Sequence, residues 1–414
     1  MKFFGWRMVF TGLAVEFTVI GFLFYCFPVF WPFLISELGM TESQLGMVTA
    51  FYFIPVAILA IFIGRALDKY SVKNFMMIGS IIYAVGLFSL SFVNTYWSLL
   101  TIYLTVLALG SIMMGNLAIA KLISNWFDKN AGRALGIAAV GISFSGVVLP
   151  LIVDPLLDVV GWRNVYVIFA SVVFFVILPL IFFVVIDDPT TVNQVKDGIK
   201  KDLEEQSLPQ NMTSKDLLSK KVFWIISLAF ALQFLSMMGV IAFLPIHASK
   251  MGLNEIWNIL DFPVKQYVFA YALAAFGGVL GKLIFGYLMD LMRAAYPSMI
   301  AMSLQAIGIF GFTYFSEPSI FFLSALIFGL GYGAATPLMT ACYLRAFGSN
   351  NLGKARGISS PIVAPLQPIG ILITSIFIGF QDTYFVAFNI MGCFALVAAV
   401  LASQIQEPKK SNMY

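Results

Sequence analysis

Twelve apolar segments, each long enough to cross a lipid bilayer as a helix, divide this 414-residue chain. A hydrocarbon core about 30 Å thick takes roughly 20 helical residues to cross. The segments that meet this length are 8–34, 44–63, 75–93, 98–123, 134–153, 165–186, 222–247, 267–289, 298–316, 319–344, 357–380 and 384–403. One polar stretch separates them six and six. We therefore predict an all-α membrane protein with two six-helix bundles, over 1–186 and 222–403, joined by a solvated tether over 187–221 and followed by a tail over 404–414.

The composition excludes several other classes of protein. Hydrophobic residues make up 60% of the chain and charged residues only 11%, which excludes an ordinary soluble domain. The three cysteines and the single histidine form no metal-binding spacing, so we expect no metal and no cofactor. The sequence contains no phosphate-binding loop, no catalytic pair and no basic stripe suited to nucleic acid. We therefore expect neither an enzyme nor a nucleic-acid-binding protein.

The positive charges predict how the spans are oriented. If the N-terminus is cytoplasmic, 20 of the 24 Lys and Arg residues lie in cytoplasmic segments, and the outer loops hold only Arg163, Lys250 and Lys265. Cytoplasmic loops of membrane proteins carry such an excess of positive charge. We expect a multi-pass protein of the cell (inner) membrane, with both termini in the cytoplasm and with the monomer as the functional unit.

The two halves of the chain repeat each other. A shift of 221 residues places Leu109-Gly110 on Leu330-Gly331 and the segment 132–137 on 353–358, both at the junction of the fourth and fifth spans of their half. The smaller shift of 213 that aligns Pro32 with Pro245 implies a longer loop around residues 256–265. Duplication of this kind is typical of transporters whose halves rock around a central site.

The loop after the second span carries a recognisable signature. It reads Gly64-Arg65-Ala66-Leu67-Asp68-Lys69-Tyr70-Ser71-Val72-Lys73 and resembles the G-x-x-x-D-[RK]-x-G-x-[RK] loop of the major facilitator superfamily, with Ser71 in place of the second Gly. The second half repeats it in part, with Leu291 in place of the basic residue. In that family the cluster latches the cytoplasmic side in one state. The resemblance implies a latch made of Gly64, Asp68, Lys69, Gly286, Asp290, Arg293 and Arg133, and the alternative is that these charges only fix the topology.

Three further segments narrow the resemblance. The exit of the first span, 27–39, the run Asn125-Trp126-Phe127 and the triplet Gly161-Trp162-Arg163 look like those of the monocarboxylate and oxalate/formate carriers. This implies a secondary transporter that moves a small organic anion, foremost a monocarboxylate with a proton. An anion exchanger of the oxalate/formate type and a drug or metabolite efflux pump are alternatives, and a transporter-like solute receptor is a further one.

Lys282 is a charge deep within the eighth span, about 12 Å along an ideal helix from Asp290. Charges at such depth are expensive and need a structural or functional reason. The resemblance places Lys282 where carboxylate carriers of this family hold a basic residue, usually Arg, that meets the anion. The second basic residue that the oxalate carrier has in span eleven finds no counterpart between Gly357 and Phe380, and this departure from the resemblance favours a monoanion over a dianion. The alternatives are that Lys282 extends to the cytoplasmic face or pairs with Glu16.

Glu16 lies at a similar depth in the first span, about 13 Å from Arg7. Burial favours its neutral form and a nearby lysine favours its charged form, so we predict that Glu16 is the proton-coupling residue. A structural ion pair is the alternative.

Three other polar residues are candidates for a role in the site. Asn116 and Tyr332 lie in Gly-rich spans of the kind that line the cavity in the superfamily, so both are candidate substrate-binding residues. Hydrogen bonds between helices are their alternative role. His247, at the outer end of the seventh span, is a candidate sensor of external pH or an interfacial residue without a role.

Overall fold

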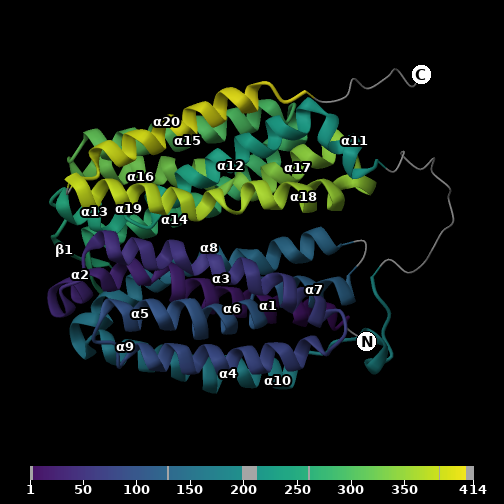
Figure 1. Cartoon of the computed structure of the whole chain (residues 1–414), viewed down its shortest axis with the longest axis horizontal. Helices are drawn as coiled ribbons and strands as arrows, with labels where there is room; N and C mark the ends of the chain where they lie inside the picture. Colours follow the sequence, from purple (N-terminus) through teal and green to yellow (C-terminus); the bar gives the residue numbers. More distant parts are fainter. Residues whose placement is uncertain (1–2, 128–129, 198–211, 260–261, 382, 407–414) are drawn as a thin grey trace. The chain divides into compact units, whose positions relative to one another are not determined.

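The computed structural model describes residues 3–127, 130–197, 212–259, 262–381 and 383–406 (Figure 1). Within these residues, twelve helices or helix runs are long and apolar enough to cross a membrane, which confirms the predicted all-α, twelve-span fold. They cover Gly5–Leu38, Glu42–Leu67, Val72–Leu90, Tyr96–Trp126, Arg133–Val160, Trp162–Val184, Lys221–Ile241, Gln266–Met289, Ala295–Tyr314, Pro318–Phe347, Asn351–Phe380 and Phe385–Ser403.

Contacts divide the chain into two compact units. Unit 1 comprises Met1–Leu203 together with Ile256–Val268, and unit 2 comprises Glu204–Glu255 together with Phe269–Tyr414. Each unit is built around one set of six spans. The sequence did not indicate that a short segment after the seventh span would join unit 1.

Unit 1 is a bundle in which α1 packs against α8, and α4 packs against both α6 and α9. In Figure 1 its helices carry the colours from purple to blue-teal. Its elements are α1 (Gly5–Ile20), the π-helical turn η1 (Gly21–Tyr25), α2 (Phe27–Leu38), α3 (Glu42–Leu67), α4 (Val72–Leu90), α5 (Tyr96–Ile102), the π-helical turn η2 (Tyr103–Leu107), α6 (Ala108–Met114), α7 (Asn116–Trp126), α8 (Ala131–Val160), α9 (Trp162–Val172), the π-helical turn η3 (Val173–Ile177), α10 (Leu178–Val184) and the 3-10 turn η4 (Pro189–Val192).

Unit 2 repeats the bundle, with α15 packed against α16 and α20, and α12 packed against α19 and α20. Its helices are α11 (Ser214–Ser219), α12 (Lys221–Ile241), α13 (Leu244–Lys250), α14 (Gln266–Leu291), α15 (Ala295–Tyr314), α16 (Pro318–Gly333), α17 (Ala335–Phe347), α18 (Ser349–Val363), α19 (Leu366–Gln381) and α20 (Phe385–Ser403). The first three residues of α14 belong to unit 1 by their contacts.

The repeated glycines Gly110 and Gly331 stand where helices cross closely. A Cβ added at Gly110 of α6 would lie 2.6 Å from the backbone nitrogen of Tyr83 in α4. A Cβ added at Gly331 of α16 would lie 2.8 Å from Cα of Gln305 in α15. Small residues allow such contacts between membrane helices. Each unit needs a small residue at this helix crossing, which explains why the two halves share this glycine.

Spans four and ten are both interrupted. Gly115 separates α6 from α7 with φ −87° and ψ −143°, which is not a helical conformation, whereas Ala334, between α16 and α17, keeps right-handed helical angles of φ −74° and ψ −14°. Interrupted backbone within a membrane is tolerated where protein or a polar cavity surrounds it. The breaks place Asn116 at the first residue of α7 and Tyr332 in the last turn of α16.

The start of the predicted tether is docked on unit 1, which corrects the expectation of a solvated segment. The Trp126 indole donates to the carbonyl oxygen of Ile186 at 2.7 Å, and the Asn125 amide donates to that of Asp187 at 3.1 Å. Further along, the backbone N–H of Asp197 donates to the carbonyl oxygen of Trp126 at 3.2 Å. Backbone groups of α7 and side chains near its end therefore hold residues 186–197. The remaining tether residues 198–211 lie outside the described residues.

A β-hairpin replaces the longer loop expected between α13 and α14. Its strands β1 (Ile256–Ile259) and β2 (Phe262–Lys265) pair antiparallel, with Ile256 opposite Lys265 and Trp257 opposite Val264. Val264 is buried, whereas Ile256 is exposed. The strand β2 contacts α8, which explains why the hairpin belongs to unit 1.

Candidate functional site

A polar cluster in unit 1 surrounds Glu16. This residue of α1 is only 2% exposed, and the Asn116 side chain hydrogen-bonds to its carboxyl group. Its second oxygen, Oε2, has no hydrogen-bond partner among the described residues. A buried carboxyl oxygen without a donor is costly for the charged form and suits a group that binds a proton or meets a ligand.

The same cluster extends to α3 and α6. The Tyr52 hydroxyl lies 2.6 Å from the Ser111 hydroxyl, and Tyr52 is near enough to interact electrostatically with Glu16. Three spans of unit 1 therefore contribute polar groups to one place. Glu16 and Asn116 are candidates from the sequence, whereas Tyr52 and Ser111 are not. A hydroxyl in an apolar helix gives no signal of its own without the fold.

Lys282 lies in α14 of unit 2, half-buried, directly after Gly281. Gly277 and Gly281 face the backbone of α16 at the carbonyl oxygens of Leu326 and Leu330, so the two helices cross closely at this point. The close crossing fixes the section of α14 that carries Lys282.

Tyr332 of α16 lies beside the same section of α14. Its hydroxyl would be 3.1 Å from a Cβ added at Gly278, one turn before Lys282. Its ring packs on that of Phe328 with centroids 5.0 Å apart, and the residue is 7% exposed. The structure therefore brings Tyr332 to the helix section that bears Lys282. Glu16 and Asn116 form their cluster in the other unit.

The residues of the predicted latch have separate surroundings in the two units. In unit 1, Lys121 Nζ lies 2.6 Å from Asp68 Oδ1, Lys69 is exposed, and the Arg133 guanidinium stands 6.0 Å from the Trp6 ring centroid. A Cβ at Gly64 would meet only Leu117, at 3.9 Å, so no helix approaches this glycine closely.

In unit 2 a residue outside the predicted latch bonds to the end of α14. Gly286 has no atom within 4 Å of an added Cβ, and Arg293 is exposed. The side chain of Asp290 lies outside the described residues. Arg345, near the end of α17, donates to the carbonyl oxygens of Met289 and, at 2.8 Å, of Met292. The sequence did not single out Arg345, which bonds to the end of α14 as Lys121 in span four bonds to the residue that ends α3.

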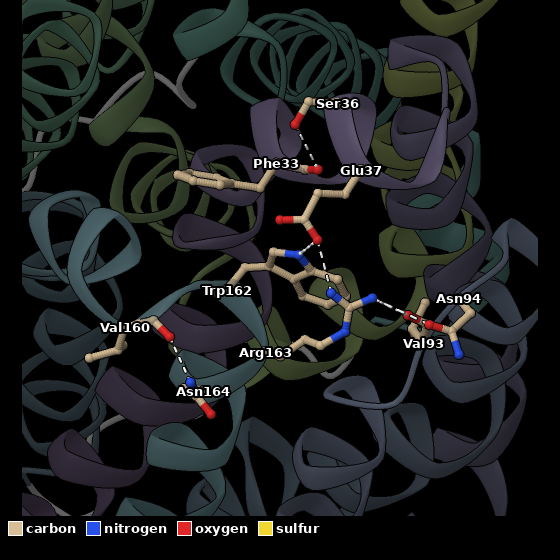
Figure 2. A network of polar contacts seen from close by, with 9 residues as sticks. All are labelled: Phe33, Ser36, Glu37, Val93, Asn94, Val160, Trp162, Arg163 and Asn164. Carbon is tan, nitrogen blue, oxygen red and sulfur yellow. Dashed lines mark hydrogen bonds and ion pairs between the residues drawn. The ribbon is translucent and has the colours of Figure 1, made fainter.

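The triplet 161–163 anchors three loops at the end of unit 1 opposite the N-terminus (Figure 2). Glu37 at the end of α2 accepts hydrogen bonds from the Trp162 indole at 2.8 Å and from Arg163 at 2.9 Å. Arg163 also donates to the side chain of Asn94, between α4 and α5, at 3.3 Å. Gly161, with φ +79°, makes the tight connection between α8 and α9 that a side chain would strain. This motif is therefore an anchor of the bundle.

His247 is buried inside unit 2, at 4% exposure, and does not lie at an interface as expected. Its Nε2 is 2.8 Å from the carbonyl oxygen of Phe312, and aromatic rings of Phe321, Tyr384 and Phe388 surround it. In the described residues no group of three or more His, Cys, Asp or Glu side chains is arranged to hold a metal ion.

Several known proteins are similar to this chain, some over most of its length and others over about a third of it. A protein-family model described as Major Facilitator Superfamily matches residues 13–366. The sialic acid transporter NanX of Escherichia coli is 23% identical over 364 residues, which cover 83% of this chain and 84% of NanX. The MFS-type transporter pynF of Aspergillus niger is 28% identical over 159 residues, and this alignment spans only 38% of the chain and 36% of pynF.

A solved structure has the same fold. The crystal structure of a bacterial homolog of the human lysosomal transporter Spinster superposes with a TM-score of 0.74 at 14% sequence identity, over 97% of both chains. Such low identity carries information about the fold alone.

Proposed function

This chain belongs to the major facilitator superfamily, and on that basis we propose that it moves a small organic anion across the membrane, namely a monocarboxylate together with a proton, by alternating access. It is a multi-pass membrane transporter of small solutes. The proposal concerns which solute it carries and how the movement is driven.

The observation that carries the proposal is Lys282. A lysine in the middle of a membrane span is costly and needs a reason, and its ammonium group can form a charge-assisted hydrogen bond with a substrate carboxylate in each transport cycle. The close crossing of α14 and α16 places the Tyr332 hydroxyl on the helix section that bears Lys282, where it can donate to the second oxygen of a carboxylate. NanX, a relative over most of the chain, is by its name a carrier of an organic acid.

Glu16 is our candidate for the proton-coupling residue. In the charged form its unpartnered Oε2 would be a buried anion, which opposes the binding of a second anion. In the protonated form the carboxyl becomes a neutral donor. Binding of the anion and of the proton would then favour each other, as symport requires. Asn116 hydrogen-bonds to Glu16, so its side-chain amide would respond to the protonation state of Glu16 and change how it binds the substrate.

The latch residues would set which side is open. We propose that Asp68, Lys69, Arg133 and their counterparts close the cytoplasmic side in one state. The excess of Lys and Arg in the inner loops supports cytoplasmic termini in the cell membrane. Each chain would hold one complete site, so a monomer would suffice for transport.

The experiment is uptake into proteoliposomes. A panel of labelled organic acids is tested with and without an inward proton gradient, using the wild type, Lys282→Ala and Lys250→Ala. Lys250 contacts the ring of Tyr384 at 5.4 Å outside the spans, so its replacement is the matched control for the loss of one lysine.

We expect gradient-driven uptake of at least one monocarboxylate, a loss of about tenfold or more in Lys282→Ala and little change in Lys250→Ala. Exchange without any response to the gradient would favour the oxalate/formate type of exchanger. Failure of every acid, together with protection of bacteria from cationic dyes, would favour efflux and contradict the proposal.

A further inference from the structure

The hairpin β1–β2 occupies an unusual place in the chain. It follows α13 and precedes α14, whose main parts belong to unit 2, yet it is a part of unit 1. The chain therefore leaves unit 2 before Ile256 and returns to it after Val268. Any rearrangement between the units must either carry the hairpin away from α8 or deform its two connections.

The contact of the hairpin with α8 is an ion-pair cluster around one buried acid. Asp154 of α8 is 1% exposed in its side chain and accepts from Lys265 twice, from the backbone N–H at 3.2 Å and from Nζ at 3.1 Å. The same Nζ lies 2.8 Å from Asp158, one turn further along α8. Lys265 thus binds two carboxylates at once.

Aromatic groups complete the cluster. Nζ of Lys265 stands 5.9 Å from the ring centroid of Phe33 in α2, and Tyr267, in the first turn of α14, interacts with Asp154. A charge in such surroundings is stabilised by its partners and penalised when they leave. Release of Lys265 would leave Asp154 buried without its cation, which makes a half-released hairpin unfavourable. The contact is suited to two states, bound and fully released.

We propose that the hairpin is a conformational clasp, in which Lys265, Asp154 and Asp158 hold the start of α14 on α8 and set the balance between the closed and open forms at this end of the transporter. Lys265 directly precedes α14, and Lys282 lies 17 residues further along the same helix. That separation is about 25 Å along an ideal helix. A rigid helix would transmit the state of the clasp to the section that bears Lys282. The proposal holds for any solute, and its test needs none.

The test measures distances between the units by double electron–electron resonance. Cys26, Cys342 and Cys393 are first replaced by alanine, and spin labels are placed at Trp97 of α5 and Ser316, both exposed. Each label lies in a loop or helix start that follows an odd-numbered span, as the hairpin does. Because successive spans cross the membrane in opposite directions, segments after odd-numbered spans lie on the same side of it. The variants are Lys265→Met, Asp154→Asn and Asp158→Asn, with Lys250→Met as the control for loss of one lysine.

We expect Lys265→Met and Asp154→Asn to raise the ratio of long to short distances by roughly tenfold, and Asp158→Asn to raise it less, because that carboxylate is half-exposed. Lys250→Met should leave the ratio unchanged. The exchange Lys265→Asp with Asp154→Lys keeps the net charge and should restore the wild-type ratio. A cluster that only stabilises the fold would lower the melting temperature and leave the ratio alone, and that result would overturn the proposal. Should Lys265→Met not fold, an unchanged ratio in Asp154→Asn and Asp158→Asn would overturn it equally.

Discussion

Lys121 Nζ lies 2.6 Å from Asp68 Oδ1, and this ion pair joins α7 to the residue that ends α3. The side chains are 34% and 68% exposed. Exposed pairs of this kind contribute little to stability, so Lys121→Met should lower the free energy of unfolding of unit 1 by less than about 1 kcal/mol. If Lys121 holds Asp68 away from the other latch residues, Lys121→Met should also alter the transport rate by about fivefold or more. Thermal melts in detergent and uptake assays measure the two effects separately.

Lys215→Met is the control for this prediction, because Lys215 is an exposed lysine of α11. It should change neither quantity. A melting temperature that falls strongly in Lys121→Met, with normal transport, would make the pair a structural one.

The anchor around Glu37 should behave in the opposite way, with a large effect on stability. Glu37→Ala leaves the indole N–H of the buried Trp162 without its acceptor, whereas the Arg163 guanidinium is 39% exposed and can bond to water instead. The expected loss is about 1–3 kcal/mol, seen as a lower melting temperature. Ser36→Ala is the control, since the Ser36 hydroxyl only donates to the carbonyl oxygen of Phe33 on the exposed side of α2 (Figure 2). A melting temperature in Glu37→Ala equal to that of Ser36→Ala would contradict the role of an anchor.

The spans could be predicted because the length of an apolar run is a property of the sequence alone. The hairpin could not, because four residues such as Ile256–Ile259 carry too weak an alternation, and their buried contact lies in α8, about a hundred positions earlier. The docked start of the tether escaped prediction for a related reason, since its partners are backbone groups and side chains of α7.

For the candidate site, the sequence identified charges at unusual depth and missed their neighbours. Glu16 was evident because a carboxyl group in an apolar span is rare. Tyr52 and Ser111, which share its cluster, are ordinary residues in their helices until the fold brings α1, α3 and α6 together. Gly64 matched a family pattern, but the structure shows no close helix approach there.

The clasp should be insensitive to moderately alkaline pH. Burial lowers the pKa of Lys265, but its hydrogen bonds and charge interactions with Asp158 and Asp154 outweigh burial and keep the pKa above its usual value. A group whose pKa is raised by folding contributes its full stabilisation below its unfolded pKa, about 10.4. This stabilisation is lost only as the pH rises through the higher pKa of the folded state. The distance ratio between labels at Trp97 and Ser316 should therefore stay constant between about pH 7 and pH 9. A change over this range would mean that the lysine titrates earlier than its surroundings require.

Two of the repeated glycines, Gly110 and Gly331, should tolerate no side chain. Gly110→Ala and Gly331→Ala would push a methyl group into the backbone of a neighbouring helix, and we expect each to destabilise its unit by about 1–3 kcal/mol. Gly136→Ala and Gly357→Ala, also at repeated positions, meet nothing within 4 Å and should be neutral. Melting temperatures of the four variants test the contrast. Equal values would show that the helix crossings can move apart without loss.

Glu16→Gln should separate proton coupling from substrate movement. Glutamine keeps the size and the hydrogen-bonding capacity of a protonated glutamate but cannot ionise. In proteoliposomes, uptake driven by an inward proton gradient should fall to the level seen without the gradient, whereas exchange of internal for external labelled acid should continue. The reason is that exchange needs only the protonated form, and glutamine imitates that form throughout the cycle.

Tyr52→Phe is the matched control for Glu16→Gln, because it removes the hydroxyl bonded to Ser111 and leaves the carboxyl in place. It should keep the response to the gradient, even if the rate falls through disturbed packing. Unchanged pH dependence in Glu16→Gln would move proton coupling elsewhere, whereas loss of exchange as well as uptake would make Glu16 a structural residue. Loss of the gradient response with intact exchange would identify Glu16 as the coupling residue. Uptake driven by the gradient needs a group that alternates between charged and neutral forms, whereas exchange does not.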